Sequence, residues 1–230
     1  MTSLLVATLL VAASAVAQEV GRIDLTKVGA NPLKHKKFKR DASCDKDTST
    51  GMGGEGFAYP FGLSLLSAAP TEVQIGGEMI VSLRLRNVGY RPVSVPWITD
   101  PDQIEQPEAD GYFRYSESHF RANIGSEDGG GAYFHMPVYL YGANEIPGSL
   151  REIRPGEYVE LKIKLVLDCK TKEAQCRSLR TGPARLSFTW VNLELSETYE
   201  KCGIVRRDIG IRAADSDTAA IRILDRAASQ

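Results

Sequence analysis

Several features that would assign this chain to a functional class are missing from its sequence. Helical periodicity is nearly absent, and no apolar run reaches the roughly 20 residues that a membrane-spanning helix needs. Lys and Arg number 28 and Asp and Glu number 29, which gives a formal net charge of −1. This balance argues against a nucleic-acid-binding protein, which typically carries a basic surface. No N-x-S/T acceptor occurs, so we expect no N-glycosylation.

Catalytic motifs are missing as well. The sequence contains no G-x-S-x-G, no H-E-x-x-H and no P-loop. The nearest arrangement is His119 beside Ser116, Glu117 and Ser118. Neighbouring residues of an extended segment point to opposite faces, so Ser118 and His119 would not meet. We therefore expect no catalytic residues, no cofactor and no enzymatic activity.

Cysteine is scarce but even in number, with Cys44, Cys169, Cys176 and Cys202. An even count in a chain that begins with a secretory signal peptide, as the first 17 residues here suggest, favours disulfides over free thiols. Zinc binding is the rival interpretation, yet neither Cys169 nor Cys176 has a C-x-x-C partner, and the three histidines lie far from these two cysteines in the sequence. We expect no metal site.

The N-terminus has the pattern of a secretory signal peptide over residues 1–17. An apolar run from Leu4 to Val11 leads into small residues, and Ala15 and Ala17 supply an A-x-A cleavage pattern, although no Lys or Arg precedes the run. A membrane anchor is the alternative, but residues 4–17 are too few to cross a bilayer. The sequence thus predicts a secreted or periplasmic protein with no transmembrane segment in the mature chain.

Residues 18–60 are predicted to form a flexible arm. They contain a basic run from Lys34 to Arg40 and a Gly-rich stretch at 51–56. Such segments bury too little apolar surface to offset the entropy of ordering them. The basic run is interpreted as a solvated part of this arm, and weak contact with an anionic surface is the alternative.

From residue 61 onward, alternating apolar and polar residues predict β-strands. Within residues 72–97, Met79, Val81, Leu83 and Leu85 fall on one face and Arg84 on the other. A period of two with charges outward places one face on a core and the other in water. The predicted core is Trp97, Trp190, Val159, Leu161, Ile163, Leu165 and Leu167.

Four segments occur in an order that resembles a known family. They are LRLRNVGYRPVSVPW, IRPGEYVELKIKL, GPARLSFTW and SDTAAIRIL. The order is similar to strands B, E, F and G of immunoglobulin-like modules of secreted bacterial proteins. The resemblance implies an all-β, antiparallel sandwich over residues 61–226, with an aromatic-rich insertion at 101–141. The cysteine pair that joins strands B and F in antibody domains is absent here.

The resemblance also suggests a disulfide pairing. It places Cys169 and Cys176 in the E–F connection and Cys202 in the F–G connection, at the other end of the sandwich. A strand of about ten residues separates these ends by roughly 30 Å, whereas a disulfide needs Cα atoms within about 7 Å. The resemblance therefore implies Cys169–Cys176 and Cys44–Cys202, while the sequence alone allows all three pairings.

The insertion is the feature that hints at recognition. It holds 8 of the 16 Tyr and Phe residues of the chain, and Tyr suits binding surfaces for proteins and glycans. Tyr115, Tyr133 and Phe134 flank a predicted Gly-rich hairpin turn and are the predicted binding residues. In the alternative interpretation these rings pack the hairpin onto the sandwich.

An acidic loop follows the strand that ends near Trp97. It carries Asp100, Asp102, Glu105, Glu108 and Asp110. The spacing differs from an EF-hand loop, because no glycine stands at the sixth position. We interpret it as a solvated loop, with a calcium site as the alternative.

These patterns together predict an exported, non-catalytic binding or structural module that acts on a protein or glycan partner. The alternative is a protease inhibitor or a hydrolase built on a β-sandwich scaffold.

Overall fold

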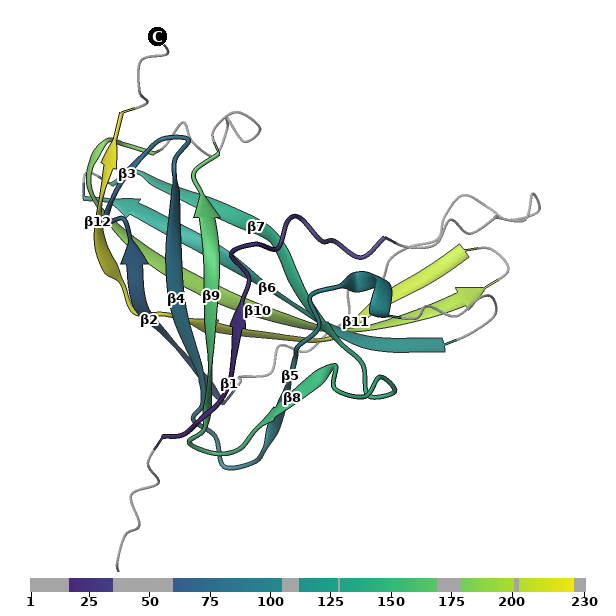
Figure 1. Ribbon diagram of the computed structural model, residues 1–230. Helices are drawn as coiled ribbons and strands as arrows, with labels where there is room; N and C mark the ends of the chain where they lie inside the picture. The colour runs from purple at the N-terminus through teal and green to yellow at the C-terminus, as the bar shows by residue number, and fades with distance from the viewer. Residues whose placement is uncertain are drawn as a thin grey trace, which may run out of the picture.

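The computed structural model describes residues 17–34, 60–104, 112–127, 129–168, 179–200 and 203–225, and these residues form an almost entirely β structure (Figure 1). The elements are β1 (Glu19–Asp24), β2 (Phe61–Ala69), β3 (Glu72–Gln74), β4 (Glu78–Asn87), β5 (Val93–Pro96), the 3-10 turn η1 (Pro101–Gln103), β6 (Tyr112–Ser126), β7 (Gly131–Gly142), β8 (Leu150–Ile153), β9 (Tyr158–Val166), β10 (Gly182–Glu200), β11 (Gly203–Asp215) and β12 (Ala219–Leu224). Within these ranges no helix has the length and apolar character to span a bilayer.

Two sheets carry most of the strands. The first sheet has the order β1-β9-β4-β2, and the second has the order β3-β12-β10-β6-β7, with β11 also paired to β10. Strands β5 and β8 form a small separate ribbon. The all-β prediction is confirmed, but the expectation of purely antiparallel sheets is wrong. Both β1 on β9 and β3 on β12 are parallel edge pairs, and each adds a short strand to an otherwise antiparallel sheet.

The hydrophobic core lies between the two sheets, as the alternating pattern predicts. Trp190 of the second sheet is 1% exposed and meets Phe61 of the first sheet edge-to-face, with ring centroids 5.3 Å apart. Trp97 is only partly buried and packs against the edge of this core. The remaining predicted core residues are all buried: Val159, Leu161, Ile163, Leu165 and Leu167.

Residues 18–34 are not a flexible arm, contrary to the sequence prediction. Strand β1 pairs in parallel with β9, and Leu25 at its end is 1% exposed. The chain then crosses the second sheet beside β7, where the Asn31 side chain donates to the carbonyl oxygen of Tyr139 (2.8 Å) and accepts from its amide (2.7 Å). The few apolar residues of β1 are enough to order this segment, because strand β9 supplies hydrogen-bond partners for its backbone. The composition of the segment does not reveal that partner strand.

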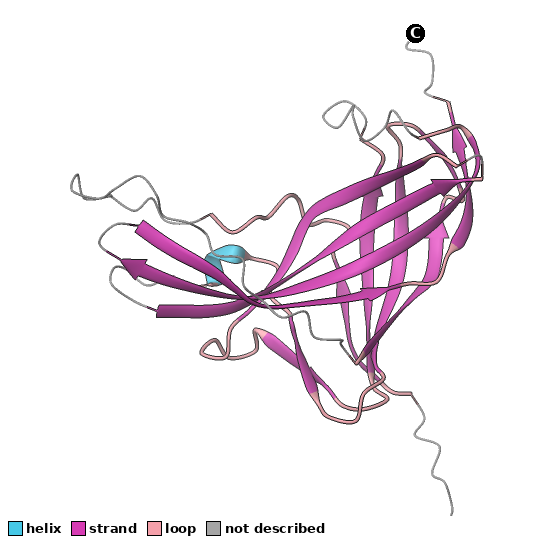
Figure 2. Cartoon of the chain, turned by 180° about the vertical axis from the view of Figure 1, so that it is seen from behind, coloured by secondary structure: helices cyan, strands magenta, loops and turns pink. Residues whose placement is uncertain are grey.

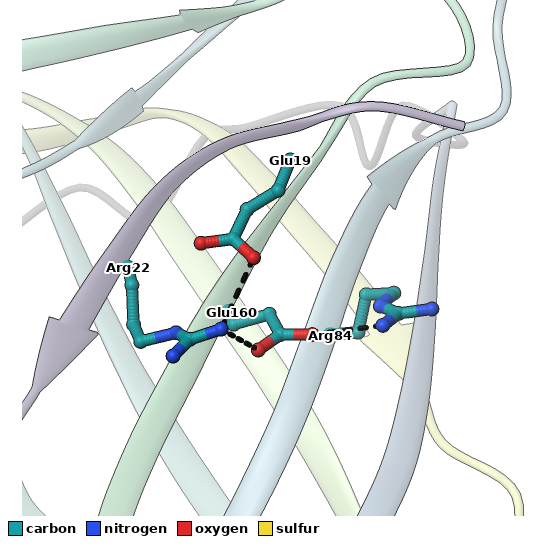
Figure 3. A network of polar contacts seen from close by, with 4 residues as sticks. All are labelled: Glu19, Arg22, Arg84 and Glu160. Atoms are coloured by element: carbon teal, nitrogen blue, oxygen red, sulfur yellow. Dashed lines mark hydrogen bonds and ion pairs between the residues drawn. The ribbon is translucent and has the colours of Figure 1, made fainter. Parts of the chain in front are cut away.

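A network of ion pairs ties β1 to the outer face of the first sheet (Figure 3). The Arg22 guanidinium lies 3.1 Å from Glu19 and 2.9 Å from Glu160, and Glu160 lies 2.8 Å from Arg84. The Arg84 guanidinium also covers the Tyr158 ring, 4.1 Å from its centroid. These side chains belong to β1, β9 and β4, so the network links three neighbouring strands.

The Glu160→Gln variant should report the strength of this network. The hydrogen bond from Arg84, with the nearby Arg22 charge, lowers the pKa of Glu160 below its ordinary value. A lowered pKa stabilises the fold above the unfolded-state pKa, and this contribution disappears as pH falls through the folded-state pKa. We expect the substitution to lower the free energy of unfolding by about 1 kcal/mol at neutral pH. Urea unfolding over a pH series should show the difference vanish in acid, and a pH-independent difference would contradict this account.

The aromatic segment is a hairpin, as predicted, but it is not an insertion. Strand β6 pairs with β10 continuously from Ser126↔Ala184 to Tyr112↔Thr198, so the hairpin is part of the second sheet. The sequence interpretation ended the strand after Trp190 and missed β11. The hairpin residues that exceed the length of an ordinary sandwich therefore belong to the second sheet. Part of their partner strand lies in residues 191–200, which the sequence interpretation did not assign to a strand.

The second sheet extends beyond the first as a three-stranded wing (Figures 1 and 2). We define the wing as residues 112–119 of β6, 191–200 of β10 and 203–213 of β11. Strand β10 buries opposite faces in its two halves: Phe188 and Trp190 face the main core, whereas Leu195 is fully buried on the other face. There it belongs to a second cluster, made of Ile104, Tyr115, Tyr141, Ala143 and Leu195.

Several predictions fall outside the described residues. The acidic loop is described only at its start, where the Asp100 carboxylate accepts from the amide of Asp102 (3.0 Å) and caps η1. The predictions for residues that are not described concern the signal peptide through residue 16, the basic run after Lys34, both disulfides (Cys169–Cys176 and Cys44–Cys202) and the loop at 105–111.

Candidate binding pocket

A polar pocket lies where the wing begins to extend beyond the first sheet, between the wing and the β5–β8 ribbon. Its volume is about 300 Å³. The wing supplies its charged side chains, and the ends of β5, β7 and β8 supply much of the opposite wall. Its lining is Pro92, Val93, Ser94, Arg114, Tyr115, Ser116, Gly142, Ala143, Asn144, Leu150, Glu194 and Arg212.

Three charged side chains from three adjacent strands meet in this pocket. Glu194 stands on β10, between Arg114 of β6 and Arg212 of β11. The Arg114 Nη2 atom lies 3.2 Å from the Glu194 Oε2 atom, and Arg212 forms an ion pair with the Glu194 Oε1 atom. Strand register explains the meeting: Arg114 pairs with Ser196 and Arg212 pairs with Asn192, so each is a diagonal neighbour of Glu194 on one face.

The pocket carries an excess of positive charge. Its described lining contains two guanidinium groups and one carboxylate, which leaves one positive charge if all three groups are ionised. Burial lowers the pKa of Arg212 to about 10, so the side chain stays charged at neutral pH. A positive charge held in a partly enclosed site attracts an anion more strongly than one in open water.

Uncharged polar groups line the same pocket. Ser94, Ser116 and Asn144 bring hydroxyl and amide groups that can donate and accept hydrogen bonds. On the same face of the wing, the Ser118 hydroxyl donates to the Asn192 side-chain oxygen at 2.9 Å, and both residues are buried. This combination of two cations and several hydroxyl and amide groups can orient a small, oxygen-rich anion.

The three predicted binding residues do not form a common exposed patch, so that expectation is wrong. Tyr115 is 2% exposed, and its hydroxyl donates to the Glu197 carboxylate at 3.0 Å. Phe134 is buried in the main core, whereas Tyr133 is 68% exposed. Tyr133 and Phe134 are neighbours in β7, and successive strand residues point to opposite faces. Of the three, Tyr133 has an exposed side chain, and Tyr115 belongs to the lining of the polar pocket.

The predicted separation of Ser118 from His119 is confirmed. Ser118 lies on the pocket side of β6 and bonds Asn192, whereas the His119 ring contacts His135 and Tyr139 on the opposite side. Sequence reasoning missed Arg114, Glu194 and Arg212. Their only signal is a charged residue within an otherwise alternating strand, which a solvated face produces equally well.

Comparisons with known proteins do not identify a family. No protein-family model and no curated protein matches the sequence. Solved structures align only distantly. They include an alkylpurine DNA glycosylase of Pseudomonas fluorescens (9% identity, TM-score 0.30, covering 72% of this chain and 30% of that one) and a Bordetella pertussis protein described as ApaA (11%, 0.31, 74% and 98%). A sporulation control protein of Bacillus subtilis aligns at 11% identity and TM-score 0.30, covering 71% of this chain and 49% of that one. At these TM-scores the similarities carry no functional argument.

Proposed function

We propose that this protein is an exported, non-catalytic module that binds an acidic sugar residue of a glycan in the pocket between the wing and the β5–β8 ribbon. The observation that carries the proposal is the convergence of Arg114 and Arg212 on a single carboxylate, Glu194. Guanidinium groups bind carboxylates through paired, charge-assisted hydrogen bonds. The predicted signal peptide at residues 1–17 supports an exported location.

The size and lining of the pocket favour a sugar over a protein surface. A volume of about 300 Å³ lies at the lower end of the range for small-molecule sites. A stable protein interface instead buries about 800 Å² on each partner. Ser94, Ser116 and Asn144 suit the hydroxyl groups of a sugar, and the two arginines suit its carboxylate.

The strand order supports an immunoglobulin-like scaffold as part of this proposal. Strands β2, β4 and β9 are neighbours in the first sheet, in the manner of strands A, B and E. Strands β6, β10 and β12 are neighbours in the second sheet, in the manner of C, F and G. On such scaffolds, binding sites vary while the packed sheets persist.

Binding of acidic and neutral oligosaccharides to matched variants tests the function. We expect the mature protein to bind oligogalacturonate and not a neutral glucan oligomer. Arg114→Gln should weaken binding about 10- to 100-fold, since a hydrogen bond to a charged group contributes about 1.5–3 kcal/mol. Glu194→Gln should strengthen binding, because it removes the internal anion that competes for both arginines. Isothermal titration calorimetry measures each affinity.

Arg222→Gln is the matched control. Arg222 lies on β12, outside the pocket lining, and its guanidinium is 3.7 Å from Glu72 on the surface. The same loss of charge there should leave affinity unchanged. Equal binding of neutral and acidic sugars would contradict the proposal, as would an unaltered affinity for Arg114→Gln. Tighter binding of a poly-glutamate peptide than of any oligosaccharide would replace the glycan with an acidic protein partner.

A further inference from the structure

Three aromatic rings gather on the face of the second sheet that points away from the main core. The His119 and His135 ring centroids are 4.6 Å apart. The Tyr139 ring centroid lies 5.6 Å from that of His119 and 6.2 Å from that of His135. His119 belongs to β6 and the other two residues to β7. His119 pairs with Tyr139 and Arg121 pairs with His135, with a register irregularity between the two pairs.

His119 is unusual within this group. It is only 4% exposed, yet neither of its ring nitrogens has a hydrogen-bond partner among the residues that the structure describes. A buried polar atom without a partner is destabilising, because it has lost its hydrogen bonds to water without gaining others. A neutral imidazole carries the lone pair that a metal ion needs.

We propose that His119, His135 and Tyr139 bind a divalent first-row transition metal ion, with Cu²⁺ the preferred ion. Imidazole nitrogens are common ligands of zinc, copper and nickel, and Cu²⁺ binds tightest in this series. The described part of the chain holds no group of three or more His, Cys, Asp or Glu side chains placed for a metal. We take the Tyr139 phenol oxygen as the third ligand, because the Tyr139 ring lies beside both histidine rings. The phenol would release its proton to water and bind the ion as phenolate.

The separations between the rings fit one shared ion. A metal–nitrogen distance of about 2.0–2.1 Å places an ion about 3.2 Å from the centroid of each imidazole. Two imidazoles at right angles around that ion then have centroids about 4.5 Å apart, close to the observed 4.6 Å. A 180° flip of an imidazole about its χ2 bond can bring the other side of the ring toward the ion without moving the centroid.

A pocket beside β7 reaches one member of this group, His135. His135 is half-buried and lines a second pocket of about 330 Å³, between β7 and the end of β9. On β6, Glu117 and Arg121 lie two residues to either side of His119, so their opposite charges flank the site.

Titration of the full mature chain with CuSO₄, followed by visible absorption and electron paramagnetic resonance, tests the site. We expect one Cu²⁺ per chain, coupling to two imidazole nitrogens and a phenolate-to-copper charge-transfer band. His119→Ala and His135→Ala should each raise the Kd at least about tenfold. Tyr139→Phe should keep the copper but lose the charge-transfer band.

His35→Ala is the matched control, because His35 is the one other histidine of the sequence. Its copper affinity should equal that of the unsubstituted chain. Thermal melting without metal checks that each variant is folded. If His119→Ala unfolds, two results still test the site. They are copper binding by the His135→Ala variant, in which a half-buried residue is changed, and the electron paramagnetic resonance spectrum of the unsubstituted chain. Loss of binding in His35→Ala, unchanged binding in His135→Ala, or the absence of stoichiometric copper would overturn the site.

Discussion

The Trp190→Ala variant is expected to lose about 3–5 kcal/mol of unfolding free energy, the range for large aromatic residues removed from cores. Trp190 is 1% exposed and packs edge-to-face on Phe61, which belongs to the opposite sheet. Its removal leaves a cavity at the contact between the two sheets, and the paired strands on either side restrict collapse into that space. Chemical denaturation followed by far-ultraviolet circular dichroism measures the loss.

Tyr133→Ala is the control for this experiment. Tyr133 also lies in the second sheet, but it is 68% exposed. Its removal should change the free energy of unfolding by no more than about 0.5 kcal/mol. If Trp190→Ala were equally mild, Trp190 could not be the contact that joins the two sheets.

Tyr141→Ala should have an effect of similar size in the second cluster, about 3–5 kcal/mol. Tyr141 is fully buried beneath the segment that follows β1. Its hydroxyl donates to the carbonyl oxygen of Asn31 (2.8 Å) and accepts from the amide of Leu33 (2.7 Å). The substitution therefore removes a ring from the cluster and also releases two backbone groups of that segment.

Hydrogen exchange at the Leu33 amide distinguishes the two parts of this effect. Tyr141→Phe keeps the ring but removes both hydrogen bonds, and should cost about 1–3 kcal/mol. In both variants the Leu33 amide should exchange faster, while the amide of Leu83 in β4 should stay protected under native conditions. Unchanged protection at Leu33 would show that other contacts hold the segment in place.

The position of the pocket could not be read from the sequence for a definite physical reason. Arg114, Glu194 and Arg212 are far apart in the chain and meet because β10 continues past Trp190 and turns back as β11. The buried apolar side chains change face along β10: Trp190 points into the main core, whereas Val191 and Leu195 are buried on the opposite face. The polar and apolar positions therefore exchange roles within one strand. A fixed alternation rule cannot anticipate that exchange, because it depends on which sheet or loop covers each half.

The predictions for residues 35–40 and for the four cysteines depend on the sequence alone. Their composition supports a solvated basic segment and two disulfides as predictions, and neither belongs to the described residues. The predicted arm was wrong over residues 18–34 for a reason that is visible in the fold. Asn31 uses its side-chain amide as a strand would use its backbone, bonding both the carbonyl oxygen and the amide of Tyr139.

The sequence by itself determined the all-β class, the strands β4, β9 and β12, the β6–β7 hairpin and six of the seven predicted core residues. These follow from a period of two, which is a local property of the backbone and of side-chain polarity. Tertiary structure alone decided that β1 is an edge strand, that the hairpin joins β10 and that His119 lies against His135. It also decided that two arginines share one carboxylate. Such contacts depend on strand register and on which face is covered, and both are set only when distant segments pack together.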